Sequence, residues 1–152
     1  MIAIILALAV MFAQSPAERR MGLDAMILET PGTRTIAKGD QSNIDDARQV
    51  LVRSEAEWTK LWNQHAPDHQ RPAVDFSKQM VVAVFMGSRP NAGFSTAIVS
   101  ATATPSGTLL VRYKETRPAT GAISAQILTF PYHIVAISKA DVKDVKFEKD
   151  PR

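Results

Sequence analysis

The hydrophobic pattern downstream of residue 34 predicts a series of short strands. Runs rich in Val, Ile, Thr and Ala alternate with proline-containing segments, which is typical of strands joined by turns. The predicted strands are 35–38, 48–53, 80–86, 94–104, 109–115, 126–138 and 142–147. Residues 80–86 (MVVAVFM) are apolar without alternation, which indicates a central strand buried on both faces. Pro131 interrupts 126–138, which indicates a bulge or a sheet edge there.

A helix is predicted between the second and third strands. Ser54-Glu55-Ala56-Glu57 is a capping box, in which the Ser54 hydroxyl accepts from the N–H three residues on and Glu57 reaches back. An apolar stripe at helical spacing follows, and the pattern ends before Pro67. The stripe is formed by Trp58, Leu61, Trp62 and His65. We interpret the two tryptophans as anchors that pack the helix onto the sheet; a ligand-stacking platform is the alternative.

These elements predict an α+β fold, a mainly antiparallel twisted sheet with one N-terminal capped helix packed on it. The alternative is a small β-barrel or sandwich with one helix. The chain has 152 residues, which suits one domain able to bury a core without a metal or disulfide. We expect a signal peptide at 1–17, an N-terminal segment at 18–34 whose structure the pattern does not determine, and a single domain at 35–149.

The N-terminal run MIAIILALAVMFA is uncharged and apolar. It is shorter than the roughly 20 residues of a membrane span, and small residues that suit a signal peptidase follow it. We expect export, with cleavage after Ala13 or Ala17; an uncleaved membrane anchor is the alternative. The chain has no cysteine, which excludes disulfides, a thiolate nucleophile and a lipid anchor on cysteine. Exported proteins without disulfides are common in bacteria, so we expect a periplasmic or secreted bacterial protein.

Charge and motifs argue against nucleic-acid binding and against several kinds of catalysis. The net charge of +3 is scattered, without the basic block that a nucleic-acid site needs. No G-x-S-x-G motif is present, and His133 is predicted to be a hydrogen-bonded sheet residue. His65 and His69 have metal-ligand spacing, with Asp68 beside them, but Pro67 interrupts the helix between them. We therefore expect no catalytic residue, metal or cofactor; a hydrolase or metal enzyme around His65, His69 and Asp68 is the alternative.

The segment GSRPNAGF, residues 87–94, is rich in glycine and follows the buried strand. A phosphate-binding loop would need a lysine and a following helix, and this segment has neither. We interpret it as a hairpin turn, with Gly87 and Gly93 as its structural turn residues. The candidate partner-binding residues of this loop are Arg89, Pro90, Asn91 and Phe94. Arginine and aromatic side chains on a rigid turn are favoured anchors at protein interfaces.

Spaced glycine, proline and aromatic positions form a longer pattern over most of 39–139. They are Ser54-x-x-Glu57-Trp58-x-x-Leu61-Trp62, Asp75-Phe76, Gly87-x-Arg89-Pro90-x-x-Gly93-aromatic, Gly107-x-Leu109-x-Val111-x-Tyr113 and Thr129-x-Pro131-Tyr132. This pattern resembles the C-terminal domain of the PrcB-type protease-complex proteins, which more usually have tyrosine where Phe94 stands.

The resemblance implies an exported, non-catalytic bacterial protein that binds a protein partner. The best-known member of the family stabilises a cell-surface protease complex, so an extracytoplasmic protease is the partner class that the resemblance suggests. Nucleic acid, a small-molecule cofactor and, in the mature form, a membrane are not expected as partners. A related alternative is a protease inhibitor-like binder.

Overall fold

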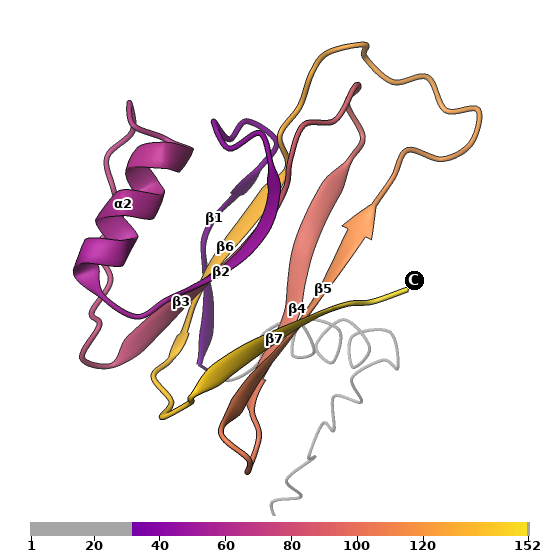
Figure 1. Cartoon of the computed structure of the whole chain (residues 1–152). Helices are drawn as coiled ribbons and strands as arrows, with labels where there is room; N and C mark the ends of the chain where they lie inside the picture. The colour runs from indigo at the N-terminus through magenta and orange to yellow at the C-terminus, as the bar shows by residue number, and fades with distance from the viewer. Residues whose placement is uncertain (1–31, 152) are drawn as a thin grey trace, which may run out of the picture. The chain divides into compact units, whose positions relative to one another are not determined.

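The apolar strand predicted at 80–86 lies inside a four-stranded antiparallel sheet. A computed structural model describes residues 32–151, and in it the strand spans Gln79–Met86 (β3). Its neighbours are β2 (Ala47–Val52) on one side and β6 (Tyr132–Ser138) on the other, and β1 (Thr33–Gly39) pairs with the far side of β6. Every residue from Met80 to Met86 is buried, which confirms a central strand covered on both faces (Figure 1).

The remaining strands form a second sheet of three strands. It contains β4 (Ser95–Ala103), β5 (Thr108–Thr116) and β7 (Asp144–Lys149), in the order β4-β5-β7. β4 and β5 are antiparallel, whereas β5 and β7 are parallel. The α+β class with mainly antiparallel strands and a single helix in the described range is confirmed, but the strands divide between two sheets. The sheets do not close on themselves, so the barrel alternative is wrong.

The helix α2 (Glu55–His65) covers one face of the four-stranded sheet. Ser54 is its N-cap and accepts from Glu57 N at 3.3 Å, while the Glu57 carboxylate accepts from Arg53 N at 2.7 Å. In the usual capping box the Glu57 side chain would accept from the N–H of the N-cap residue, Ser54. Here it accepts from the residue before, Arg53. Trp58 is completely buried and its indole donates to Pro72 O at 2.9 Å. The tryptophans thus anchor the helix, as predicted.

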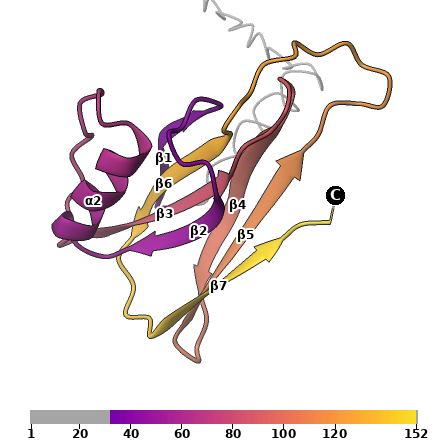
Figure 2. The ribbon, with the colours of Figure 1, turned by 45° about the horizontal axis from the view of Figure 1, so that its top comes forward.

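Two hydrophobic clusters lie on opposite faces of β3, as the two-residue repeat of a strand requires. Val81, Ala83 and Phe85 pack toward α2, whereas Met80 and Val82 pack toward the second sheet. The described chain therefore has three layers, with the helix, the four-stranded sheet and the three-stranded sheet in that order (Figure 2).

His133 on β6 joins the two sheets by hydrogen bonds. Its Nδ1 accepts from Ile98 N on β4 at 2.8 Å, beside the register shift of that strand. The proton then lies on Nε2, which donates to Thr35 Oγ1 on β1 at 3.0 Å. Burial, with a smaller effect of the Lys38 charge, lowers the pKa of His133 to about 4. The prediction of a hydrogen-bonded sheet residue is confirmed.

One predicted strand is too long. Residues 126–131 are not part of β6, which begins at Tyr132; they belong to a long connection, 117–131, between β5 and β6. Outside the named strands, this connection makes only isolated bridges, at Thr129 and Phe130. Pro131 lacks an N–H for a strand ladder, and Ile127 and Leu128 are exposed, so this half of the predicted strand has no sheet to join. The predicted signal peptide lies outside the described residues.

Candidate functional site

The loop 87–94 crosses from one sheet to the other. β3 pairs with β2 and β6, and β4 pairs with β5, so the predicted hairpin turn is wrong. The change of layer occurs at glycines with positive φ, 74° at Gly87 and 98° at Gly93. A Cβ on Gly87 would lie 2.7 Å from Ala47 N, and one on Gly93 would lie 2.9 Å from Pro118 Cγ. The chain therefore turns where neighbouring segments leave no room for a side chain.

The second loop, 117–131, is hydrogen-bonded to the first. Arg89 N donates to Thr129 O at 2.8 Å, and Thr129 N donates to Arg89 O at 2.9 Å. Ala92 N donates to Ala125 O at 2.9 Å, and the Thr129 hydroxyl donates to Asn91 O at 3.1 Å. Both loops lie at the same end of the two sheets (Figure 1). Two connections far apart in the sequence thus form one structural unit.

The four predicted partner-binding residues lie on the first loop but are less exposed than a free turn would make them. The Arg89 guanidinium carbon lies 5.8 Å from the centre of the Phe94 ring, and both side chains are half-buried. This contact is a cation–π pair. Pro90 is exposed and Asn91 half-buried. Arg89 Nε and Asn91 Oδ1 are buried without a hydrogen-bond partner in the described part of the chain.

The second loop carries an apolar surface that the sequence analysis missed. Ile123 is fully exposed, at 103%, and Ile127 and Leu128 are exposed at 52% and 58%. Connections longer than about 12–15 residues without their own secondary structure are usually either functional loops or linkers, and this one is hydrogen-bonded to the loop 87–94. The signal in the sequence was the length of the connection between β5 and β6. Ile127 and Leu128 concealed it, because they resemble the start of a strand. We call Arg89, Pro90, Phe94, Ile123, Ile127 and Leu128 the paired-loop surface.

The two loop segments that carry the paired-loop surface contain few charged residues and no acidic residue. Arg89 is the only charged residue between 87 and 108, and Arg117 is the only one between 117 and 131. Neither segment contains Asp or Glu. The surface therefore combines exposed apolar side chains with a weak positive potential.

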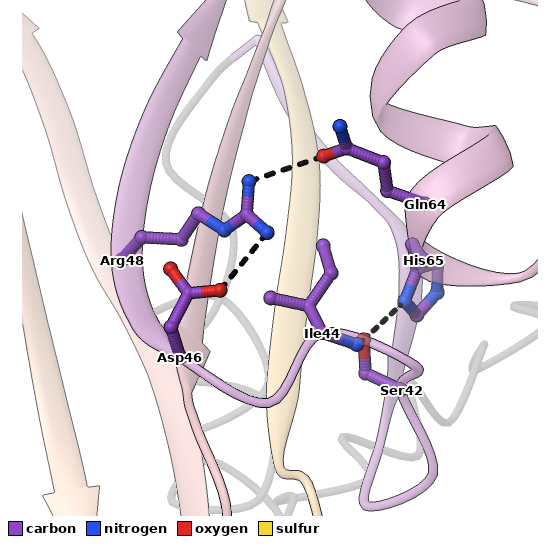
Figure 3. A network of polar contacts seen from close by, with 6 residues as sticks. All are labelled: Ser42, Ile44, Asp46, Arg48, Gln64 and His65. Atoms are coloured by element: carbon purple, nitrogen blue, oxygen red, sulfur yellow. Dashed lines mark hydrogen bonds and ion pairs between the residues drawn. The ribbon is translucent and has the colours of Figure 1, made fainter.

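The histidines do not form a metal site. His65 is buried on α2, where Ser42 Oγ lies 2.8 Å from its Nδ1 (Figure 3) and Tyr132 packs 4.2 Å away, centre to centre. Burial and, less, the charge of His69 lower the pKa of His65 to about 4. His69 and Asp68 are exposed, and residues 32–151 contain no group of three or more metal-ligating side chains. The residues of the enzyme alternative are therefore not brought together.

Comparison with known families gives a match of residues 80–138 to the PrcB C-terminal family. The matched segment begins in β3 and ends with β6, so it contains both loops. The family resemblance is confirmed over this segment, and the motifs at 54–62 and 75–76 lie outside it. No curated protein and no solved structure matches the chain. Among residues 32–151, no helix has the length and hydrophobicity that crossing a membrane requires.

Proposed function

Because residues 80–138 match the PrcB C-terminal family, we propose that this protein is an exported, non-catalytic interaction module that stabilises or assembles an extracytoplasmic protease complex. We place its partner-binding site on the paired-loop surface. The observation that carries this proposal is the exposure of Ile123, Ile127 and Leu128 on a loop that is hydrogen-bonded to the Arg89 loop.

The energetics of this surface favour a protein partner. Complete burial of one isoleucine or leucine side chain contributes about 1.5–3 kcal/mol, and three such side chains are available. Arg89 belongs to the residue types that dominate binding energy at interfaces, and Phe94 to those enriched there. The hydrogen bonds between the loops hold them before binding, which reduces the conformational entropy lost in the complex.

The charge of the surface defines the chemistry of the partner. A protein pocket with apolar walls and acidic residues at its rim would bury Ile123 and Ile127 and attract Arg89 and Arg117. Rim charges act mainly on the association rate. We therefore expect association to slow as ionic strength rises, while the lifetime of the complex depends on the apolar residues.

The test is affinity capture from native envelope extract followed by mass spectrometry. The baits are the wild type, Arg89→Ala/Phe94→Ala and Ile123→Ser/Ile127→Ser, with Arg112→Ala on the exposed face of β5 as the matched control. We expect one set of partners with the wild type and with Arg112→Ala, and at least about tenfold less with either loop variant. Thermal unfolding of each bait verifies its fold. Equal recovery by all four baits would overturn the placement of the site.

The same material distinguishes a stabilising role from the inhibitor-like alternative. If a captured partner is a protease, its activity and its lifetime are measured with and without this protein. A longer lifetime at unchanged activity supports stabilisation or assembly. A loss of activity that Ile123→Ser/Ile127→Ser relieves would instead identify an inhibitor. Capture of partners without any protease would contradict the proposed complex while keeping the binding site.

A further inference from the structure

β2 forms an open edge of the four-stranded sheet. It pairs with β3 on one side, and no described strand pairs with its other side. Beside it runs a groove of about 300 Å³ between β2 and α2. Three consecutive strand residues, Val50 to Val52, line this groove together with Lys60 and Leu61 of the helix. Consecutive strand residues point to opposite faces, so the groove must follow the edge of β2 and not only one face.

The hydrogen bonds of β3 show to which side of β2 each backbone N–H and C=O group points. Alternate residues of a strand direct their N–H and C=O groups to opposite sides. Met86 N donates to Pro131 O, on the β6 side of β3, at 2.9 Å. By the same repeat, Val84 and Val82 also direct their backbone groups toward β6, where they oppose residues of that strand. Their partners on β2 therefore receive no hydrogen bond from β3.

Those partners are Gln49 and Leu51. Their N–H and C=O groups point away from β3 toward the open edge, and no residue of the described chain is hydrogen-bonded to them. Two residues farther on, Arg53 N follows the same direction and is capped by the Glu57 carboxylate at 2.7 Å. The edge is thus closed at its end and open at Gln49 and Leu51, where an added strand would find two donors and two acceptors.

The side chains around the edge define what would fit. Val50, Val52 and Leu61 give the groove an apolar floor. Lys60 lines it and has no ion-pair or hydrogen-bond partner among residues 32–151, whereas the Arg48 guanidinium is held by Asp46 and Gln64 at 3.0 and 3.1 Å (Figure 3). Glu57 also lines the groove, but its carboxylate is occupied by Arg53 N. Lys60 is therefore the charged side chain of the groove that no described residue binds.

We propose that the β2 edge and its groove bind an extended segment of a partner protein as an added antiparallel or parallel strand, with apolar residues at alternate positions and a carboxylate opposite Lys60. Main-chain hydrogen bonds to Gln49 and Leu51 supply affinity, and the groove supplies specificity. This site is separate from the paired-loop surface and does not depend on the function proposed for it.

The test uses random ten-residue peptides displayed on phage and selected against the purified full protein. We expect enriched peptides with alternating apolar residues and an Asp or Glu. Synthetic versions are then titrated by fluorescence anisotropy. Methylation of alternate backbone nitrogens on the peptide side that faces β2 should abolish binding, because it removes the donors of an added strand.

The sharpest variant pair is Gln49→Pro and Gln49→Ala. Both remove an exposed side chain, but only proline removes the outward N–H, and an edge position tolerates proline. We expect Gln49→Pro to weaken peptide binding about tenfold or more and Gln49→Ala to change it less than about twofold. Lys60→Glu should weaken acidic peptides by about fivefold or more and Lys60→Gln by less.

Arg89→Ala/Phe94→Ala should leave peptide binding unchanged, so failure here and failure of the proposed function are distinguishable. Far-UV circular dichroism and thermal unfolding verify the fold of each variant. Enriched peptides that bind Gln49→Pro as tightly as the wild type, or the absence of any enriched peptide, would overturn the proposal. A concentration-dependent dimer lost in Gln49→Pro would also overturn it, because the edge would then bind a second copy of the chain.

Discussion

Gly87 determines how the chain leaves β3. Its φ of 74° lies in the left-handed region, and a Cβ would lie 2.7 Å from Ala47 N and 3.0 Å from Asp45 O. These atoms belong to the backbone at the start of β2 and just before it, which cannot give way as a flexible side chain would. Gly121, at φ 80°, is the useful comparison, because a Cβ there would meet nothing within 4 Å.

We predict that Gly87→Ala destabilises the protein by about 2–4 kcal/mol, since backbone strain adds to the steric clash. Gly121→Ala should cost about 1–2 kcal/mol, because only the strain of a positive φ remains. Urea unfolding of both variants and the wild type measures the two free energies. Equal losses would show that the close approach to Ala47 does not restrict residue 87.

Arg89 and Phe94 show what residue types alone reveal about a site. Their presence in a glycine-rich loop predicted a partner-binding role, and that role stays a prediction. Their exposure was not predictable, because the two side chains contact each other and are half-buried beside a loop about 30 residues away along the chain.

At the scale of elements, His133 connects three strands. The ring receives a hydrogen bond from β4 and donates one to β1, and the neutral imidazole performs both roles. A protonated ring cannot accept from Ile98 N, so charging it breaks the bond between the sheets. His65 has an equally low pKa of about 4 between α2 and the four-stranded sheet.

We predict that the free energy of unfolding falls between pH 6.5 and pH 4. The unfolded histidines bind protons near pH 6.5 and the folded ones only near pH 4, so the unfolded state gains protons first as pH falls. The contribution of each histidine to the free energy of unfolding is fully present above pH 6.5. About 3 kcal/mol of it is lost for each histidine by pH 4. Urea unfolding from pH 7 to pH 4 measures the slope.

His133→Gln and His65→Gln are the controls for this prediction. Glutamine keeps hydrogen-bonding atoms but does not titrate. The free energy of unfolding of each variant should therefore decrease less between pH 6.5 and pH 4 than that of the wild type, even if the variant is less stable at pH 7. A wild-type free energy that stays constant from pH 7 to pH 4 would contradict the burial of both rings as neutral species.

Element positions followed closely from local patterns. The capped stripe predicted a helix ending before Pro67, and α2 ends at His65. The apolar run 80–86 predicted a strand covered on both faces, and β3 spans Gln79–Met86. The exception was 126–131, where apolar residues serve an exposed surface. A hydrophobic run identifies side chains that avoid water, but it does not say whether they pack inside the chain or against a partner.

At the scale of the whole molecule, the proposed function requires export. We predict that the protein recovered from the envelope or medium of its native host begins after Ala13 or Ala17, because a signal peptidase removes the apolar run. N-terminal sequencing or intact mass measurement identifies the cut. A full-length protein that sediments with membranes would contradict cleavage and support the alternative of an N-terminal anchor.

The two proposed binding sites present different chemical groups to their partners. The paired-loop surface presents apolar side chains, whereas the β2 edge presents backbone groups beside the Lys60 ammonium. Loss of one should leave the other intact, because they use different residues and different interactions.

The sequence by itself determined the helix, its cap, the ranges of most strands and the family motifs. Each of these depends on neighbours within a few residues, through side-chain periodicity, capping and the φ preferences of glycine and proline. Only the tertiary structure decided that the strands divide into two sheets, that loop 87–94 crosses between them and lies against 117–131, and that β2 is left at an edge. Strand pairing and loop contact depend on residues far apart in the chain, and local hydrophobic patterns do not specify which of several compatible partners a strand will meet.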